Sequence, residues 1–416
     1  MFRNVKGFGM SNRIRYLLIS VSGLLVLYVV IGGALGRGES TSEKTYRDLG
    51  VYTEVLSRIK MDYVTQPDLS KVTKGAIRGL LESLDPYSTY FTPDEFQAYL
   101  KNPTAGPANV GLVLSKKMGF STVVSVLPGS PAYKAGVKPG DLIDRIDKAP
   151  TRELSVVQLE RLLAGPAGSP VSVSVVREVR GEPQTIQMTR EVLSPPPVTS
   201  KMMEDNAAYL RVATFNKGVS KEIAAKLKEL TAQGATKIVL DLRDCAGGET
   251  DEAVKTASLF LEKGLVTYAV GQTFPREDFN VEPEGHVYKQ PLAVLINQST
   301  AGPAEVVASA VLGNKRGEVV GTRSFGMGVV QKAIPVGDGS GLLLSVAKYY
   351  RYDGKPIIDN GIQPSVVQTA SNANAGAEDE DINSLEEPEH FGGKDDLQLN
   401  KALEILKQES APAKAA

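Results

Sequence analysis

Apolar runs and helical patterns alternate through the middle of the chain, and this alternation constrains the fold more than any other feature. The apolar runs of strand length are 208–212, 238–242, 266–270 and 293–296. The helical patterns between them cover 220–232 and 252–261. Strands that are apolar on both faces and alternate with helices are typical of parallel sheets covered by helices. We therefore expect an α/β core over 195–368, in a chain that is α+β overall.

A different pattern precedes this core. Residues 108–192 carry short β-branched runs separated by turn signals, with strands expected at 122–126, 142–146 and 171–176 and a helix at 156–163. The phrase PGSPAYKAGVKPGDLIDRID at 128–147 is similar to the central stretch of PDZ domains. We therefore expect a PDZ domain over 106–194 and refer to this stretch as the PDZ module.

The resemblance to PDZ domains implies a mode of binding. It places the carboxylate-binding loop at Gly111, Leu112, Val113 and Leu114, and the helix that flanks the groove at 155–163. In such domains an extended peptide pairs with the sheet edge while loop amides hold its terminal carboxylate. The alternative is a module that docks a partner protein without recognising chain termini.

The composition limits the classes of function. The 416 residues are 42% hydrophobic, which is enough for two or three cores. A net charge of −1 gives no electrostatic footprint for nucleic acid. One cysteine and two histidines form no cluster with metal-ligand spacing, so we expect no metal and no cofactor.

The first residues predict membrane attachment. Residues 16–36 form an apolar run, and ~20 apolar residues in a helix are enough to cross a bilayer. The basic residues before it are Arg3, Lys6, Arg13 and Arg15. The positive-inside rule then puts segment 1–37 in the inner membrane with a cytoplasmic N-terminus and the rest outside the cytoplasm. The alternative is a signal peptide cleaved at the small residues of 34–36.

The remaining segments are expected to be helical or disordered. Helical patterns at 42–64 and 74–84, followed by a helix start at Thr92, indicate a helical segment over 38–105. An acidic stretch poor in large apolar residues predicts a disordered linker over 369–395. A last amphipathic helix is expected at 396–408, within a C-terminal segment that covers 396–416.

Two short blocks stand out in the second half of the chain, NQSTAGPAE at 297–305 and SFGMGVVQ at 324–331. They resemble the signature blocks of the carboxyl-terminal processing (tail-specific) peptidases. In that family the first reads roughly N-x-x-S-A-S-A-S-E, with the middle serine as nucleophile. The second reads F-G-K-G-x-x-Q, with the lysine as general base. The order of segments over 42–368 also matches the family.

The resemblance also identifies the positions at which this chain lacks the catalytic groups of the family. Gly302 stands where the family has its nucleophile, and Met327 stands where it has its base. Pro303 lacks the backbone N–H that would serve as one oxyanion donor. The other donor falls in the pair Gly247 and Gly248, which is kept. Gln331, which matches the glutamine that orients the lysine, is also kept.

Neighbouring residues are alternative candidates for the nucleophile and the base. Ser299 and Thr300 precede Gly302, and Lys332 follows Met327. Moving a nucleophile by two or three residues would turn its side chain away from the oxyanion donors.

A thiol–imidazole pair of Cys245 and His286 is a formal alternative, although nothing in the sequence brings the two together. His390 falls in the acidic linker. The simplest structural reading of Gly302 and Pro303 is a turn that opens a helix at 304–312 with proline at its first position.

The sequence therefore predicts a proteolytically silent homologue that binds peptide or protein C-termini, or that assembles with an active relative or with a second copy of itself. The alternatives are an active peptidase with a relocated nucleophile and a structural docking protein of the cell envelope.

Overall fold

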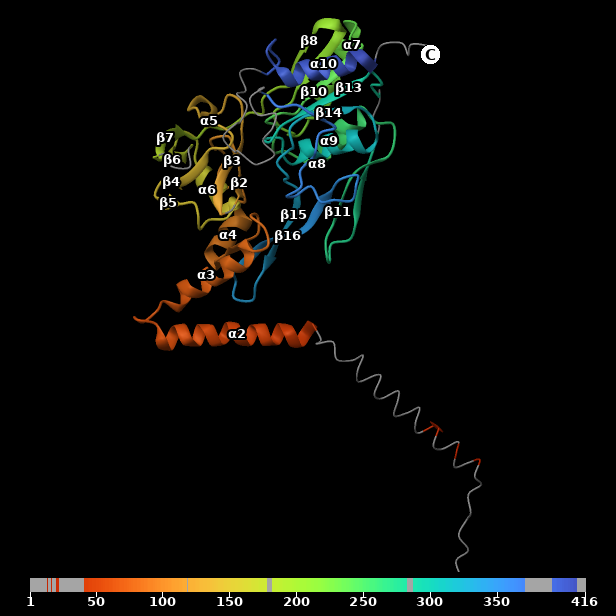
Figure 1. The fold of residues 1–416 in the computed structure, drawn as a ribbon. Coiled ribbons are helices and arrows are strands. Elements are labelled where there is room, and N and C mark those ends of the chain that lie inside the picture. The colour runs from red at the N-terminus through yellow and green to blue at the C-terminus, as the bar shows by residue number, and fades with distance from the viewer. Residues whose placement is uncertain are drawn as a thin grey trace, which may run out of the picture. The chain divides into compact units, whose positions relative to one another are not determined.

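The computed structural model describes Arg13, Tyr16, Ser20, Val21 and residues 41–117, 119–177, 182–282, 287–370 and 391–409 (Figure 1). The chain divides into two compact units, Met1–Ala76 and Ile77–Ala416, which are described separately. The predicted membrane segment 16–36 and the predicted linker lie largely outside the described residues. No helix among the described residues is both long enough and apolar enough to span a membrane.

The described part of the first unit is mainly helical. Helix α2 spans Thr41–Asp62, and helix α3 begins in this unit and spans Leu69–Glu82. Helix α3 starts earlier than the apolar pattern indicated, because Asp68 Oδ1 accepts hydrogen bonds from the N–H groups of Ser70 and Lys71 at 3.0 and 3.1 Å. A side-chain acceptor of this kind satisfies amides that have no partner in the first helical turn.

The PDZ module is an antiparallel sheet with two helices. Its strands are β2 (Leu112–Lys117), β3 (Phe120–Val126), β4 (Leu142–Ile146), β5 (Ala149–Pro150), β6 (Pro170–Val176) and β7 (Gln184–Thr189), and its helices are α5 (Pro131–Lys134) and α6 (Val156–Leu163). The strand order is β2-β3-β4-β6-β7, with β5 paired to β4. Strand β2 is therefore an edge strand, and α6 packs beside it.

The α/β core is built on a second six-stranded sheet. Its strands, in spatial order, are β17 (Val366–Val367), β14 (Glu318–Gly321), β13 (Leu292–Ile296), β10 (Lys237–Asp241), β9 (Ala207–Arg211) and β8 (Thr199–Met202). All neighbours are parallel except β8 and β9, which are joined through the short 3-10 turn η1 (Glu204–Asn206). This confirms the predicted α/β core with a largely parallel sheet.

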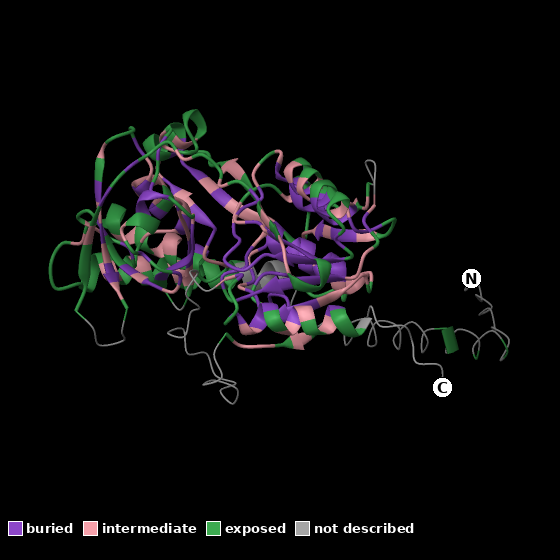
Figure 2. Ribbon diagram, turned by 90° about the horizontal axis from the view of Figure 1, so that it is seen from above, coloured by how far each residue is buried: buried purple, intermediate pink, exposed green. Residues whose placement is uncertain are grey.

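Helices cover both faces of this sheet. Helices α7 (Val219–Ala232), α8 (Thr250–Ser258) and α9 (Pro303–Gly313) share one apolar cluster with one face. Helix α10 (Leu397–Glu409) packs on the other face through Leu399, Ala402 and Leu406 (Figure 1). The buried residues gather in the strands and inner helices of this core (Figure 2).

A third sheet is antiparallel and contains one strand that the sequence had indicated for the parallel sheet. Its strands are β1 (Thr89–Phe91), β16 (Gly341–Tyr350), β11 (Leu265–Val270), β12 (Glu277–Asn280) and β15 (Val329–Pro335), and helix α4 (Pro93–Lys101) packs beside β1 and β16. The run at 266–270 is β11, which pairs with β16 rather than with the parallel strands. The polar segment after β11, for which the sequence predicts no strand, contributes β12 as the antiparallel partner of β11.

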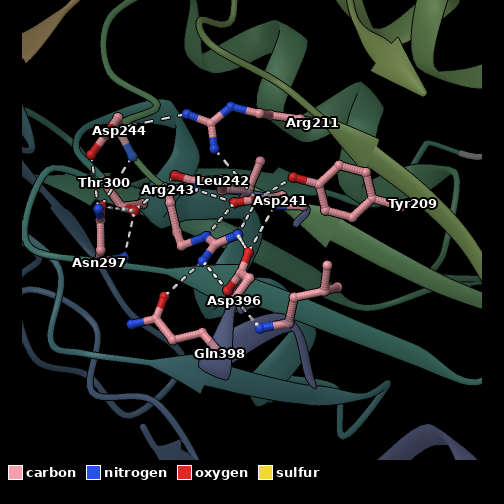
Figure 3. A network of polar contacts seen from close by, with 12 residues as sticks. Tyr209, Arg211, Asp241, Leu242, Arg243, Asp244, Asn297, Thr300, Asp396 and Gln398 are labelled. Atoms are coloured by element: carbon pink, nitrogen blue, oxygen red, sulfur yellow. Dashed lines mark hydrogen bonds and ion pairs between the residues drawn. The ribbon is translucent and has the colours of Figure 1, made fainter. Parts of the chain in front are cut away.

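A buried ionic network attaches helix α10 to the end of strand β10 (Figure 3). Arg243 Nη2 donates to Asp241 Oδ2 at 2.6 Å and to Asp396 Oδ2 at 2.7 Å, and its Nη1 donates to Asp396 Oδ1 at 2.8 Å. Burial alone would raise the pKa of Asp241, but Arg243 and Arg211 hold it at about 2. Both guanidinium groups also lie over the ring of Phe391, at 4.3 Å for Arg211 and 4.0 Å for Arg243.

Asp396→Ala should lower the free energy of unfolding of the full chain by about 3–5 kcal/mol, because it leaves part of a buried guanidinium without its partner. Urea denaturation measures this loss. The matched control is Asp395→Ala, since Asp395 is exposed and adjacent. Equal stability of the two variants would contradict the structural role of the network.

Candidate functional site

Most of the functional positions predicted from the sequence line one cavity of about 270 Å³ between the PDZ module and the α/β core, and Gly111 and Leu112 do not. From the core, the predicted positions in its lining are Gly247, Gly248, Gly302, Pro303, Met327 and Gln331. From the PDZ module they are Val113 and Leu114. Residues that are far apart in the sequence therefore form one cleft.

One buried carboxylate holds the two signature blocks together. Glu305 Oε2 accepts hydrogen bonds from the backbone N–H of both Gly302 and Met327, each at 2.8 Å. Its Oε1 accepts from Gly326 N at 2.8 Å and from the Ser324 hydroxyl at 2.5 Å. The positions predicted for nucleophile and base are thus attached to the same oxygen atom. Glu305 is the last residue of the first block, but the sequence pattern did not indicate this structural role.

The backbone at Gly302 has an unusual conformation. Its φ is 65° and its ψ is −122°, which L-residues rarely adopt. A Cβ added here would lie 3.9 Å from the Met327 carbonyl oxygen, so there is space for a side chain although the backbone would be strained. Pro303 is the first residue of α9 and has no N–H. The predicted turn with proline at the first helical position is confirmed.

Met327 is an apolar contact between the two halves of the cleft. Its half-buried side chain packs against the cluster formed by Val124 of the PDZ module and Ala246 and Ala301 of the core. A thioether has no proton to exchange, but its flexible chain fills an irregular apolar gap well. The position therefore contributes packing to the cleft.

The Gly247–Gly248 turn lines the cavity with backbone amides. Both glycines have positive φ, 77° and 101°. A Cβ on Gly248 would come within 2.3 Å of the Phe215 backbone, so only glycine fits there. Within the described part of the chain, neither N–H donates a hydrogen bond. Two unpaired amides in a cavity wall are suited to an anionic oxygen.

Hydrogen bonds fix this turn relative to the first signature block (Figure 3). Asn297 Nδ2 donates to Asp244 Oδ1 at 2.8 Å, and Asp244 N donates to Asn297 Oδ1 at 3.0 Å. Ala301 N donates to the carbonyl oxygen of Cys245 at 2.9 Å. The amides of the turn therefore keep a defined position relative to Gly302.

Gln331 connects the core to the turn after helix α3. Its Nε2 donates to the backbone oxygen of Tyr87 at 2.9 Å. The Tyr87 hydroxyl lies 3.1 Å from the Ser115 hydroxyl on β2, so Tyr87 contacts the PDZ module as well. With methionine at position 327 there is no lysine for Gln331 to orient. The contact that Gln331 makes is therefore structural. The sequence did not indicate that Tyr87 lines the cavity.

The alternative candidates for catalytic groups that the structure describes are not part of the cavity lining. Ser299 and Thr300 are buried, and the Thr300 hydroxyl donates to the carbonyl oxygen of Leu242 at 2.7 Å. Lys332 is exposed on β15. Cys245 is fully buried in the apolar core, which raises the pKa of its thiol. His286 and His390 lie outside the described residues.

The predicted carboxylate-binding loop differs from the structure. Leu112, Val113 and Leu114 form the start of β2 and pair with β3, so only Gly111 lies in a loop. The Gly111 N–H donates to Asn109 Oδ1 at 2.8 Å and is therefore occupied. The resemblance to PDZ domains placed the loop over four residues, and an apolar run after glycine suits either a loop or an edge strand.

The structure adds Glu160 of helix α6 to the cavity wall. The sequence had indicated helix α6 correctly but not which of its side chains faces the cleft. The described residues contain no group of three or more His, Cys, Asp or Glu side chains that could hold a metal ion.

Glu305 makes stability depend on pH. Burial raises the pKa of Glu305 to about 7 from an ordinary value of 4.5, so the folded protein holds this proton more tightly than the unfolded chain. Proton binding by Glu305 therefore stabilises the folded state by about 3 kcal/mol below about pH 4.5, and this stabilisation is lost as the pH rises through about 7. The Glu305→Gln variant should lack this pH-dependent stabilisation.

Denaturation of both proteins across pH 4–8 tests this expectation, because all other titrating groups are common to the two. The stability of Glu305→Gln relative to the unaltered chain should increase with pH. A difference that is constant with pH would contradict the raised pKa.

Comparison with known proteins agrees with this geometry. The family model described as peptidase family S41 matches residues 206–368, and the PDZ domain model matches residues 122–177. Among solved structures, the photosystem II D1 C-terminal processing protease is similar with a TM-score of 0.64 and 28% sequence identity, covering 76% of this chain and 92% of that chain.

Curated relatives extend the similarity over most of the chain. The carboxy-terminal-processing protease of Bartonella bacilliformis is 30% identical over 424 residues, which cover 95% of this chain and 96% of that protein. The carboxy-terminal processing protease CtpA of Bacillus subtilis is 31% identical over 353 residues, which cover 83% and 74%. This chain therefore belongs to the carboxyl-terminal processing peptidases of family S41 and carries their PDZ domain.

Proposed function

We propose that this protein is a proteolytically silent member of its family that binds the C-termini of peptides or proteins. The observation that carries the proposal is the state of the cleft. Gly302, Pro303 and Met327 line it at the positions of the nucleophile, an oxyanion donor and the base. The backbone frame around them is held in place by Glu305.

Peptide hydrolysis by a serine–lysine pair needs a hydroxyl, a neutral amine and oxyanion donors. Glycine supplies no hydroxyl, methionine supplies no amine, and proline supplies no N–H. Three separate requirements are therefore unmet at neighbouring positions. The geometry supports binding without bond cleavage.

Peptide binding needs different features, and these are present. Strand β2 is an edge strand that can accept an extended peptide by strand addition, and helix α6 flanks it. The unpaired amides of Gly247 and Gly248 supply anion donors that the occupied Gly111 amide does not. In this proposal they receive the terminal carboxylate of the bound peptide.

The relocated-nucleophile alternative has little support in this geometry, because neither Ser299 nor Thr300 belongs to the cavity lining. The docking alternative differs in one property, since a docking surface would not require a free carboxylate.

Attachment of the chain to the inner membrane through 16–36, with the bulk outside the cytoplasm, is also part of the proposal. The proposal also includes a second kind of partner, which is either an active relative or a second copy of the chain.

The unaltered chain should leave an unfolded, C-terminally tagged substrate intact under conditions in which an active relative cleaves it. Gly302→Ser with Met327→Lys should recover little activity, because one oxyanion donor is still absent. Adding Pro303→Ala should raise the rate by about 100- to 1,000-fold over the double variant. Cleavage is followed by mass spectrometry of the substrate.

Two results would contradict this expectation. Turnover by the unaltered chain that disappears in Ser299→Ala or Thr300→Ala would establish an active peptidase with a relocated nucleophile. Full activity from the double variant alone would show that the amide missing at Pro303 is not needed.

Peptides that differ only at their C-terminus separate terminus recognition from docking. A peptide with a free carboxylate should bind the full chain about tenfold or more tightly than its amide, because hydrogen bonds to a charged acceptor are lost. Fluorescence anisotropy with labelled peptides measures both affinities. Equal affinities would favour the docking alternative.

A further inference from the structure

Glu160 is the one charged side chain in the wall of the cleft. Among the described residues that line the cavity, no other is Asp, Glu, Lys, Arg or His. Glu160 lies on α6, where Val156 and Val157 also line the cavity. They precede it by four and three residues, so they share one face of the helix with it.

The Glu160 carboxylate has no counter-ion in the described part of the chain. No described residue donates a hydrogen bond to it or forms an ion pair with it within 4.0 Å. The basic residues of the neighbouring elements are engaged elsewhere. Lys116 on β2 pairs with Glu82 at 3.3 Å, and Arg161 donates to the carbonyl oxygen of Asn102 at 2.7 Å.

The Glu160 side chain is exposed to solvent, so a ligand that enters the cleft can reach its carboxyl group. Position 327 supplies no ammonium group, because it is methionine. An exposed acid in the wall of a cleft that has no internal partner is a candidate for contact with a ligand.

We propose that Glu160 selects peptides that carry a lysine or arginine side chain at one defined position near the C-terminus. This inference rests on the proposed function, since it assigns a specificity to the same cleft. An extended peptide that pairs with β2 directs every second side chain toward α6. The basic group would then form a charge-assisted hydrogen bond with the carboxylate.

The helix also predicts a spacing. Four residues of helix, with a rise of about 6.0 Å, separate Val156 from Glu160, and alternate residues of a strand are about 6.6 Å apart. The preferred ligand therefore has an apolar residue and a basic residue two positions apart.

Labelled peptides of about ten residues, built from Ala, Val and Ser with a free C-terminus, test this proposal. Each of the last six positions in turn carries lysine or norleucine, which has a similar length but no charge. At one position lysine should bind the full chain about tenfold more tightly than norleucine. Glu160→Gln should remove this preference, and Glu160→Lys should transfer it to a peptide with glutamate at that position.

Glu153→Gln is the matched control, because Glu153 is an exposed acid of the PDZ module outside the cavity lining. It should keep the lysine preference. Peptides that bind without preference for lysine at any position, or with a preference that survives Glu160→Gln, would overturn the role of Glu160 and leave the proposed function standing. Failure of every peptide to bind would overturn both.

Discussion

The buried carboxylate of Glu305 is the interaction on which the cleft depends. Its two oxygens accept four hydrogen bonds, and three of the donors are backbone amides, at Gly302, Gly326 and Met327. Backbone donors are present whatever side chain a position carries. The side chains at positions 302 and 327 can therefore change without loss of the frame that brings these positions together. This explains how the architecture of the cleft is kept with glycine at position 302 and methionine at position 327.

A second buried group links the cleft to the end of the chain. Arg243 joins Asp241, the last residue of β10, to Asp396 just before α10. The turn that carries Gly247 and Gly248 follows directly along the chain. Replacing such a network by apolar residues can be neutral, but removing one partner leaves a charge buried. Helix α10 is thus part of the support of the strand end from which the cleft is built.

Local sequence patterns were sufficient where an element is specified by its own residues. Helix α6 begins at the Ser155 cap, with Gln158 completing the capping box, and α9 begins at Pro303, so both were placed closely. Strand β11 was assigned to the wrong sheet because its partner β16 lies about eighty residues later and nothing local distinguishes the two sheets. Strand β12 was missed because a polar edge strand has the composition of a loop.

The sequence by itself determined the fold class, the family and the identity of the residues at the reacting positions. It did so because motifs, caps and apolar periodicity are local properties of the chain. Only the tertiary structure decided that Glu160 and Tyr87 share a cavity with Gly302. It also decided that the Gly111 N–H donates a hydrogen bond, whereas those of Gly247 and Gly248 donate none within the described part of the chain. These facts depend on hydrogen bonds and packing between segments distant in sequence, which no local pattern records.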